Sequence, residues 1–444
     1  MARIYPFRAW RYNPGVVRAE DVVTQPYDKI TPAMQQSYYQ RSPYNLVRVI
    51  LGLPELFDSA DNNVYSRAAK NFGNWRAEGV LAQDNEPSIY AYSQRYEVPG
   101  AAGTFQERRG FIALGEVVDY SQCIVFRHEK TLPKAKSDRL NLLRATHAHF
   151  GQIFMLYSDP SQTAENLLFA NPTTPDIELT DEYGVLHRVW KISEPGTINM
   201  LLSAMQDKKL IIADGHHRYE TALNYRKEHG AEADGAMERP TSSLPQPSFP
   251  EAAVMMTFVN MDAPGLTILP THRVVHSLEK FDPSAFLKRA EKYFQVQPIS
   301  ADSNTRAITH QLAEAGKSGV SFIAVTRSGK YLLTAKKAEI EARLKDQPER
   351  QRKLDVVQLH SVMLEDVLGI SQQAVLDQTN LRYIRDAAEA IQQVRSGDAD
   401  VAFLMNPVQL AQLREVAFAG DVMPQKSTDF YPKLLSGLTV YALD

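Results

Sequence analysis

The sequence predicts an α+β fold in two domains, and three observations carry that prediction. The chain has 444 residues, more than one domain usually holds. β-rich runs and helix-like patterns follow one another along it without an internal repeat. Residues 232–250 contain Gly, Ser and four prolines, which predicts a loop or a flexible insertion. We expect a mixed α/β N-terminal domain over residues 1–262 and an α+β C-terminal domain over residues 263–444.

The N-terminal domain begins with turns rich in Pro and Tyr. Thr31 followed by Pro32 predicts the start of a helix, because Thr caps well and Pro suits the first helical position. Residues 88–98 and 104–118 predict a hairpin around Pro99. Alternation and composition predict further strands at 47–51, 153–157, 184–192, 210–213 and 252–260, and further helices at 66–78, 137–148 and 195–205.

The C-terminal domain has a different alternation of elements. A hairpin is predicted around Ser328-Gly329, from residues 320–326 and 331–335. Gly397 and Gly420 each follow a helical pattern, where glycine commonly ends a helix. The predicted helices are 283–293, 352–368, 383–396 and 408–419, with a strand at 399–405.

Composition excludes several classes of protein. A net charge of −3 argues against a nucleic-acid-binding protein, which usually carries a strongly basic face. The single cysteine, Cys123, forms no intramolecular disulfide and excludes a zinc site built from cysteines. The N-terminus lacks the apolar region of a secretory signal, and no run of about 18 apolar residues appears. We expect a cytoplasmic protein that binds neither nucleic acid nor membrane, with a homodimer as its candidate assembly.

The densest group of polar residues follows the predicted strand 210–213. It comprises Asp214, Gly215, His216, His217, Arg218 and Glu220. The start of a helix favours an anion, because its first N–H groups point outward and its dipole is positive there. Arg218 can add a bidentate contact to phosphate or carboxylate. The motif therefore predicts an anion site, in which Asp214 either caps the helix or holds a divalent metal. The alternative is a capped, solvated helix start.

Three further clusters suit phosphate binding or proton transfer. The first is Arg127-His128-Glu129, followed by Lys136, Asp138 and Arg139; the second is Thr271-His272-Arg273; the third is loop 423–433, with Lys426 and Ser427. For each of them an exposed surface loop is the competing interpretation. Tyr27-Asp28 with Asn45 forms a further candidate, although Asp28 equally suits a turn. The chain has no Walker A, G-x-G-x-x-G, H-E-x-x-H or G-x-S-x-G motif.

Several motifs in order resemble a family described only as domain of unknown function 1015, over residues 3 to about 440. They are Gln25-Pro26-Tyr27-Asp28, Pro43-Tyr44-Asn45-Leu46-Val47-Arg48, Arg127-His128-Glu129, the segment from Ile212 to Ala222, Leu269-Pro270-Thr271-His272-Arg273 and Met423-Pro424-Gln425-Lys426-Ser427-Thr428. The resemblance gives a family and not an activity.

The Asp214-Gly215-His216-His217-Arg218 motif is also similar to the phosphate-binding turn of the ParB/sulfiredoxin superfamily. This resemblance implies a ParB/sulfiredoxin-like N-terminal domain that binds nucleotide. Two roles of that superfamily fit poorly. Sulfiredoxin needs a cysteine where this chain has His216, and partition proteins carry a basic DNA-binding surface. The branch that phosphorylates free serine remains.

The leading hypothesis is a nucleotide-dependent phosphotransferase that uses ATP or ADP with Mg²⁺ on a small hydroxylated metabolite, free serine being the first candidate. The predicted nucleotide-binding residues are Gly215, His217, Arg218, Arg127, Thr271, His272, Arg273, Lys426 and Ser427; the predicted catalytic residues are His216, Glu129, His128, Asp214 and Glu220; and the predicted metal ligands are Asp214 and Glu129. Two alternatives stay open: a regulatory protein that binds a nucleotide or phosphometabolite without chemistry, and a phosphoester hydrolase at the same site.

Overall fold

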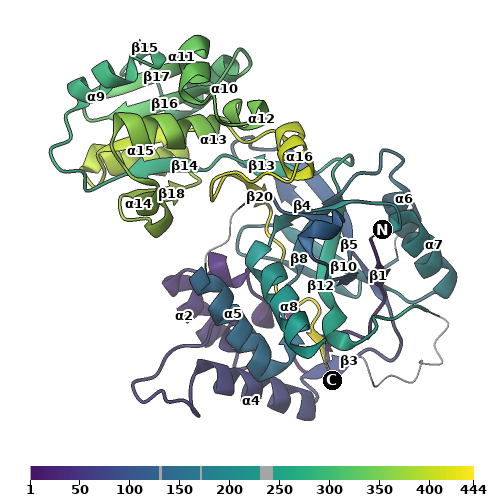
Figure 1. Ribbon diagram of the computed structural model, residues 1–444. Helices are drawn as coiled ribbons and strands as arrows, with labels where there is room; N and C mark the ends of the chain where they lie inside the picture. The colour runs from purple at the N-terminus through teal and green to yellow at the C-terminus, as the bar shows by residue number, and fades with distance from the viewer. Residues whose placement is uncertain (1, 130–132, 171–172, 231–243) are drawn as a thin grey trace. The chain divides into compact units, whose positions relative to one another are not determined.

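The computed structural model describes residues 2–129, 133–170, 173–230 and 244–444, which form two compact units. Unit 1 comprises Met1–Arg127, Thr131–Leu266 and Pro432–Asp444. Unit 2 comprises His128–Lys130 and Thr267–Tyr431. Both units contain helices and strands, so the predicted α+β class is confirmed (Figure 1).

The strands of unit 1 are β1 (Ile4–Tyr5), β2 (Trp10–Tyr12), β3 (Leu81–Gln83), β4 (Ile89–Glu97), β5 (Phe105–Glu116), β6 (Val125–Phe126), β7 (Ala148–His149), β8 (Ile153–Tyr157), β9 (Ile177–Thr180), β10 (Leu186–Ile192), β11 (Leu210–Asp214), β12 (Ala253–Asn260) and β21 (Tyr441–Ala442). Its helices are α1 (Ala19–Val22), α2 (Pro32–Arg41), α3 (Val47–Ile50), α4 (Val64–Ala77), α5 (Pro133–Thr146), α6 (Thr163–Phe169), α7 (Pro195–Met205) and α8 (His216–His229). Short 3₁₀ turns are η1 (Tyr27–Lys29), η2 (Tyr120–Gln122) and η4 (Pro250–Ala252).

The main sheet of unit 1 is mixed, with strand order β6-β11-β8-β12-β5-β4-β10-β9 and β1 paired to β5. β11 pairs parallel to β6 and antiparallel to β8, whereas β12 pairs parallel to β8. Its central strands are buried on both faces, as Met155, Ile212 and Phe258 show with no exposed surface. A strand that is covered on both faces needs apolar residues at successive positions, because both sets of side chains are buried. This explains the apolar sequences of Ile153–Tyr157 and Leu210–Asp214.

Helix α8 packs against this sheet through Tyr219, Ala222 and Leu223, which are buried in the same core as Met155 and Phe258. The Tyr219 hydroxyl donates to the carbonyl of Val118 at 2.7 Å. These contacts fix the helix, and therefore the direction in which its first turn points.

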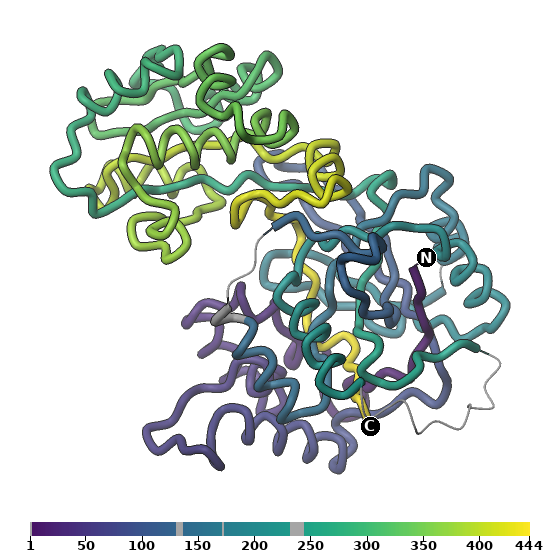
Figure 2. The backbone as a smooth tube through the Cα atoms, in the orientation of Figure 1, coloured from purple at the N-terminus to yellow at the C-terminus, as the bar shows by residue number. Residues whose placement is uncertain are grey.

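The C-terminal segment 432–444 belongs to unit 1, where Figure 2 draws it in yellow. Bridges join Thr24 to Ser436 and Trp10 to Val440. Strand β21 then pairs antiparallel with β7. This return of the chain carries Lys433 into the unit that holds β11 and α8.

The strands of unit 2 are β13 (Thr267–Leu269), β14 (His272–Val275), β15 (Phe294–Ile299), β16 (Ser321–Thr326), β17 (Gly329–Ala335), β18 (Leu381–Ile384), β19 (Val401–Leu404) and β20 (Asp429–Tyr431). Its helices are α9 (Pro283–Ala290), α10 (Thr305–Gly316), α11 (Lys337–Arg343), α12 (Glu349–Arg352), α13 (Asp355–Gln358), η5 (Leu359–Val367, a π-helix), α14 (Gln372–Asp377), α15 (Ala387–Ser396) and α16 (Leu410–Phe418).

The larger sheet of unit 2 has the order β15-β17-β16-β19-β14-β18 and is antiparallel where β14 pairs with β18 and β19. Val274, Ile323 and Leu404 from its strands form a core with Leu312 of α10 and Ile391 of α15. β13 and β20 pair in a separate two-stranded ribbon.

Most predicted elements are confirmed, but residues 47–51 are not a strand. They form the short helix α3. The β-branched residues of this segment favour a strand. The side-chain oxygen of Asn45 accepts from the N–H of Val47 at 3.0 Å, which supports a helix start instead.

Two C-terminal predictions also need correction. Residues predicted as one helix over 383–396 include the end of strand β18, and the helix begins only at Ala387, where the Asp386 side chain accepts from the N–H of Glu389. The predicted helix 352–368 breaks after α12 and resumes as α13 and the π-helix η5. The predicted loop 232–250 lies mostly outside the described residues.

Among the residues that the structure describes, no helix combines the length and the apolar character needed to cross a membrane.

Candidate functional site

The strand, turn and helix start predicted around Gly215 are present in unit 1. β11 ends at Asp214, and α8 begins at His216. Gly215 has φ 95°, a left-handed conformation that glycine adopts without penalty. A Cβ at Gly215 would also lie 3.1 Å from guanidinium atoms of Arg218. Glycine therefore permits both the turn and the close approach of Arg218.

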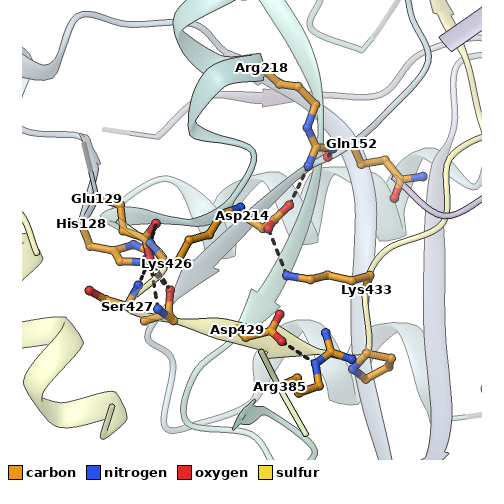
Figure 3. Close-up of polar contacts among 12 residues, drawn as sticks. His128, Glu129, Gln152, Asp214, Arg218, Arg385, Lys426, Ser427, Asp429 and Lys433 are labelled. Atoms are coloured by element: carbon orange, nitrogen blue, oxygen red, sulfur yellow. Dashed lines mark hydrogen bonds and ion pairs between the residues drawn. The ribbon is translucent and has the colours of Figure 1, made fainter. Parts of the chain in front are cut away.

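Asp214 lies between two cations (Figure 3). Its Oδ2 is 2.7 Å from Nη2 of Arg218, and its Oδ1 is 3.2 Å from Nζ of Lys433. The side chains are 23%, 15% and 8% exposed for Asp214, Arg218 and Lys433 respectively. Ion pairs this sheltered are weakly screened by solvent.

The pKa of Asp214 reflects these neighbours. Burial raises the pKa of the carboxyl group, but the positive charges of Lys433, Arg218 and Lys29 outweigh burial and hold the pKa well below its usual range. Asp214 is therefore ionised at physiological pH, and its carboxylate cannot act as a proton donor.

Arg218 has a second anchor, because its Nη1 donates to the carbonyl oxygen of Gln152. The Gln152 side chain is buried, and its Oε1 accepts from the Thr257 hydroxyl at 2.9 Å. Its amide nitrogen has no hydrogen-bond partner among the described residues. The guanidinium group is thus oriented from two sides.

The N-terminal motif with Tyr27 lies at the same place. Tyr27 and Arg218 line one small cavity of 60 Å³. Burial raises the pKa of Tyr27, with smaller effects from the charges of Asp28, Arg139, Arg218 and Asp214. The tertiary structure therefore brings two of the family-like motifs together.

Glu220, one turn into α8, has cationic neighbours of its own. Its Oε1 is 3.4 Å from Nη1 of Arg127, and its Oε2 is 2.9 Å from Nζ of Lys136. Arg127, one of the predicted nucleotide-binding residues, therefore contacts α8 through Glu220. His216 is 8% exposed and therefore largely shielded from solvent.

In unit 2, Glu129 holds the loop that contains Lys426 and Ser427 (Figure 3). Its Oε1 accepts from the N–H groups of Ser427 and Thr428 at 3.0 and 3.1 Å, and from the Thr428 hydroxyl at 3.1 Å. Its Oε2 accepts from the N–H of Lys426 at 3.3 Å. Successive N–H groups of this kind form an anion-binding nest. Here the anion is a side chain of the protein itself.

His128 is fully buried in unit 2, where its Nε2 is 2.8 Å from the Thr428 hydroxyl. It lies 6.4 Å from the ring of Phe430 in an edge-on arrangement. His128 and Glu129 therefore both contact the loop of Lys426 and Ser427.

The predicted cluster Thr271-His272-Arg273 enters β14 and is largely buried. Arg273 is 1% exposed and donates to the carbonyl of Lys426 at 3.1 Å. Burial lowers the pKa of the Arg273 guanidinium to about 10, which still leaves it charged at neutral pH. His272 is 2% exposed, and its Nδ1 accepts from the N–H of Met405 at 3.1 Å.

His272 predicts a pH dependence of stability. Burial, with help from the charge of Arg273, lowers its pKa from 6.5 to about 4. The unfolded chain then binds a proton that the folded chain does not, so stability falls as pH drops from about 6.5 to 4, by at most about 3 kcal/mol. His272→Asn keeps an acceptor for Met405 and removes the titration. Urea unfolding across this range should show a flatter pH profile for the variant, and identical profiles would contradict the assignment.

Two lysines near Asp214 were not among the predicted site residues. Lys433 ends the predicted loop 423–433, which in the structure contains strand β20 and is therefore not a loop throughout. Lys29 directly follows Tyr27-Asp28. Both motifs were singled out in the sequence, but only the tertiary structure shows that Lys433 and Lys29 act on Asp214.

The predicted site residues divide between the two units. Unit 1 contains Arg127, Asp214, Gly215, His216, His217, Arg218 and Glu220, and unit 2 contains His128, Glu129, Thr271, His272, Arg273, Lys426 and Ser427.

The predicted magnesium ligands do not fit a metal site held by the protein. Mg²⁺ prefers carboxylate oxygens and water in octahedral geometry. Both oxygens of Asp214 face cations, and both oxygens of Glu129 accept N–H groups. Across residues 2–129, 133–170, 173–230 and 244–444, no three His, Cys, Asp or Glu side chains are grouped as metal ligands would be.

Comparisons with solved structures find similarity of low score. A free serine kinase in complex with AMP is 11% identical, with a TM-score of 0.34, over 71% of this chain and 89% of that chain. A conserved hypothetical protein from Pyrococcus furiosus is 11% identical, with a TM-score of 0.33, over 71% of this chain and 92% of that one. SbnI from Staphylococcus aureus, truncated at its C-terminus, is 9% identical, with a TM-score of 0.36, over 74% and 87%. Scores this low are not evidence for a shared activity.

A comparison with curated proteins finds no match. A family model matches residues 4–357, which is most of the chain and contains the motifs from Gln25 to Arg273. The predicted family is therefore confirmed, and the chain belongs to the family described as protein of unknown function, DUF1015.

Proposed function

We propose that unit 1 binds the phosphate groups of a nucleotide at the start of α8 and transfers a phosphoryl group to a small hydroxylated metabolite, free serine being the first candidate. One observation carries the proposal: Asp214 is held between Arg218 and Lys433 at the glycine turn that opens α8. The resemblance of this turn to that of free-serine kinases supports the choice of substrate class.

The local charge favours an anion. Lys29, Arg218 and Lys433 act on one carboxylate, that of Asp214, while the nearby Asp28 is exposed to solvent. The positive end of the α8 dipole adds to the same field. A partly buried site with excess positive charge attracts phosphate groups, whose charge the cations would share.

The residues would divide the work of phosphoryl transfer. Catalysis of this reaction is mostly positioning and charge stabilisation, which suits Arg218 and Lys433. Asp214 stays ionised and would act as a positioning residue that orients both cations. The substrate oxygen would form the new P–O bond as the bond to the nucleotide breaks. The hydroxyl proton would pass to His216 or Glu220, the predicted bases on the first turns of α8.

A specific observation favours one alternative, a regulatory protein that binds a nucleotide without chemistry. The two glutamates predicted as catalytic are already engaged: Glu220 pairs with Arg127 and Lys136, and Glu129 accepts backbone N–H groups. This alternative expects nucleotide binding and thermal stabilisation without turnover.

The proposal is tested by incubating the full-length protein with serine, Mg²⁺ and either ATP or ADP, and detecting phosphoserine by ³¹P NMR. Phosphoserine formation supports the kinase proposal. Nucleotide binding without product supports the regulatory protein. Release of inorganic phosphate from added phosphoserine identifies a hydrolase. If neither ATP nor ADP binds, the phosphate site itself is wrong.

Lys433→Met is expected to weaken nucleotide binding about tenfold, because a hydrogen bond to a charged group contributes about 1.5 kcal/mol or more. Isothermal titration calorimetry with ATP and ADP measures the change. Lys227→Met is the matched control, since Lys227 is an exposed lysine near the end of α8, 61% exposed and outside the predicted site. Equal losses in the two variants would contradict the assignment of Lys433 to the site.

A further inference from the structure

A row of polar side chains is buried in the main sheet of unit 1. His187 of β10 lies opposite Gln94 of β4, and Gln94 lies opposite Arg108 of β5. Side chains at directly opposite positions project from the same face of a sheet. The three residues are 0%, 2% and 1% exposed. Because burying polar groups is unfavourable unless they form hydrogen bonds, the partners of this row indicate its role.

The C-terminal segment supplies two of those partners. Gln94 Nε2 donates to the carbonyl of Lys433 at 2.8 Å, and Arg108 Nη2 donates to the carbonyl of Pro432 at 2.5 Å. Arg108 Nε also donates to Oε1 of Gln94 at 3.1 Å, which joins the two side chains. The two carbonyls belong to the peptide groups on either side of the Lys433 Cα. The backbone from which the Lys433 side chain extends is therefore held on both sides.

Arg108 adds a buried positive charge to this row. Burial lowers the pKa of Arg108 to about 10, so the guanidinium group stays charged at neutral pH. The group lies 4.7 Å from the centre of the Phe154 ring on β8, a cation–π contact. The charge of Asp214 also acts on Arg108 and favours its charged form. The row therefore ends within electrostatic reach of the proposed phosphate site.

The other end of the row is anchored by Asp181. His187 Nε2 is 3.1 Å from Oδ2 of Asp181, and His187 Nδ1 is 2.7 Å from the Tyr92 hydroxyl and 3.5 Å from Nε2 of Gln94. Burial raises the pKa of Asp181, but its hydrogen bonds, first that with His187, hold the pKa below its usual value. The ionised carboxylate accepts from His187 Nε2, so Nδ1 accepts from the Tyr92 hydroxyl. Asp181 also accepts from the side chain of Gln25 at 3.0 Å, so the first family-like motif joins this network.

We propose that Gln94 and Arg108 are positioning residues of the phosphate site in unit 1: they fix the peptide groups on both sides of Lys433 so that its ammonium group meets Asp214. Nζ of Lys433 is 3.2 Å from Oδ1 of Asp214 (Figure 3). A lysine side chain has several rotatable bonds, and a fixed backbone limits the positions that its ammonium group can reach. The effect on Lys433 is independent of any nucleotide, whereas the effect on nucleotide binding rests on the proposed function.

Gln94→Leu tests the role of Gln94 without changing a charge. The full-length variant is acetylated at neutral pH with a limiting amount of acetic anhydride, and mass spectrometry follows the reaction of each lysine. The Lys433 side chain is 8% exposed and paired with Asp214 in the wild type. It should react about fivefold faster in the variant, because losing one hydrogen bond shifts the balance between a held and a released backbone by about that factor.

Two controls separate positioning from a general loosening of the fold. Gln358→Leu is the matched variant, because Gln358 is a buried glutamine of unit 2 whose side chain donates to the carbonyl of Arg352 at 2.7 Å. It should leave the rate at Lys433 unchanged. Lys208 is the internal control in unit 1, since it is 18% exposed and paired with Asp159. Its rate should be the same in every variant.

Gln94→Glu is a second variant. Its carboxylate still accepts from Arg108 but offers no donor to the carbonyl of Lys433, so the rate at Lys433 should again rise. Circular dichroism melts establish which variants are folded, and Gln94→Glu decides the test if Gln94→Leu does not fold. The positioning role is overturned if Lys433 reacts at the wild-type rate in the folded Gln94 variants.

Nucleotide binding provides the functional readout, measured by isothermal titration calorimetry with ATP and ADP. Gln94→Leu should weaken binding about fivefold, the loss of one hydrogen bond. It should cause little further loss in a Lys433→Met background, because both substitutions act on the same ammonium group. Equal losses in the two backgrounds would also overturn the positioning role. If the wild type binds neither nucleotide, the proposed function fails, and the acetylation rates still decide whether Gln94 positions Lys433.

Discussion

Arg218→Ala is expected to abolish measurable nucleotide binding, with a loss of at least about 100-fold. The arginine would make charge-assisted, bidentate contacts with phosphate, each stronger than a neutral hydrogen bond. It is also closer to Asp214 than Lys433 is, at 2.7 Å compared with 3.2 Å. Its removal would take away one of the positive charges that act on the Asp214 carboxylate, which weakens the positive field at the start of α8. Isothermal titration calorimetry with ATP and ADP measures the effect.

Arg218→Lys separates charge from geometry. Lysine keeps the positive charge but lacks the planar, bidentate guanidinium group of arginine. The affinity of Arg218→Lys for nucleotide should therefore lie between that of the wild type and that of Arg218→Ala. Arg144→Ala is a suitable control, because Arg144 is an exposed arginine paired with Glu228 of α8 and is 50% exposed. If a nucleotide raises the melting temperature of Arg218→Ala as much as that of the wild type, the phosphate site is not at the start of α8.

Glu129→Ala is expected to destabilise unit 2 by about 3 kcal/mol. The substitution removes an acceptor shared by the N–H groups of Ser427 and Thr428 and by the Thr428 hydroxyl. It also removes the negative charge that acts on the buried Arg273. Urea unfolding followed by circular dichroism measures the loss.

Glu129→Gln distinguishes a structural glutamate from a catalytic one. The amide keeps one acceptor oxygen for the loop, so stability should fall by only about 1 kcal/mol. If phosphoserine forms and Glu129 is the catalytic base, this variant loses turnover and keeps nucleotide binding. Glu349→Ala is the matched control for stability, because its pair with Lys353 is exposed and such pairs contribute little. A Glu129→Ala variant as stable as Glu349→Ala would contradict the anchoring role.

Local patterns were sufficient where local forces decide the structure. The apolar run before Asp214 predicted β11, and Gly215 predicted the turn, because strand burial and left-handed backbone depend on neighbouring residues. The same reasoning failed for α3. There Val47 belongs to a strand-like sequence, but the side chain of Asn45 binds its N–H and supports a helix.

The sequence could not show that the predicted site residues are divided between the two units. Arg127 and Glu129 are two residues apart, yet Arg127 pairs with Glu220 in unit 1 and Glu129 binds the Ser427 loop in unit 2. Proximity in sequence suggested one cluster. The chain passes from one unit to the other at this point, which no composition or periodicity marks.

The sequence by itself determined the family, the α+β class and the strand-turn-helix that presents Arg218, because these depend on motifs and short-range preferences. Only the tertiary structure decided which charges surround Asp214. Lys433 reaches its carboxylate across 219 residues of sequence, because the C-terminal segment returns to pair with β7. Contacts of that range depend on strand pairing and core packing, and local patterns do not encode the partner.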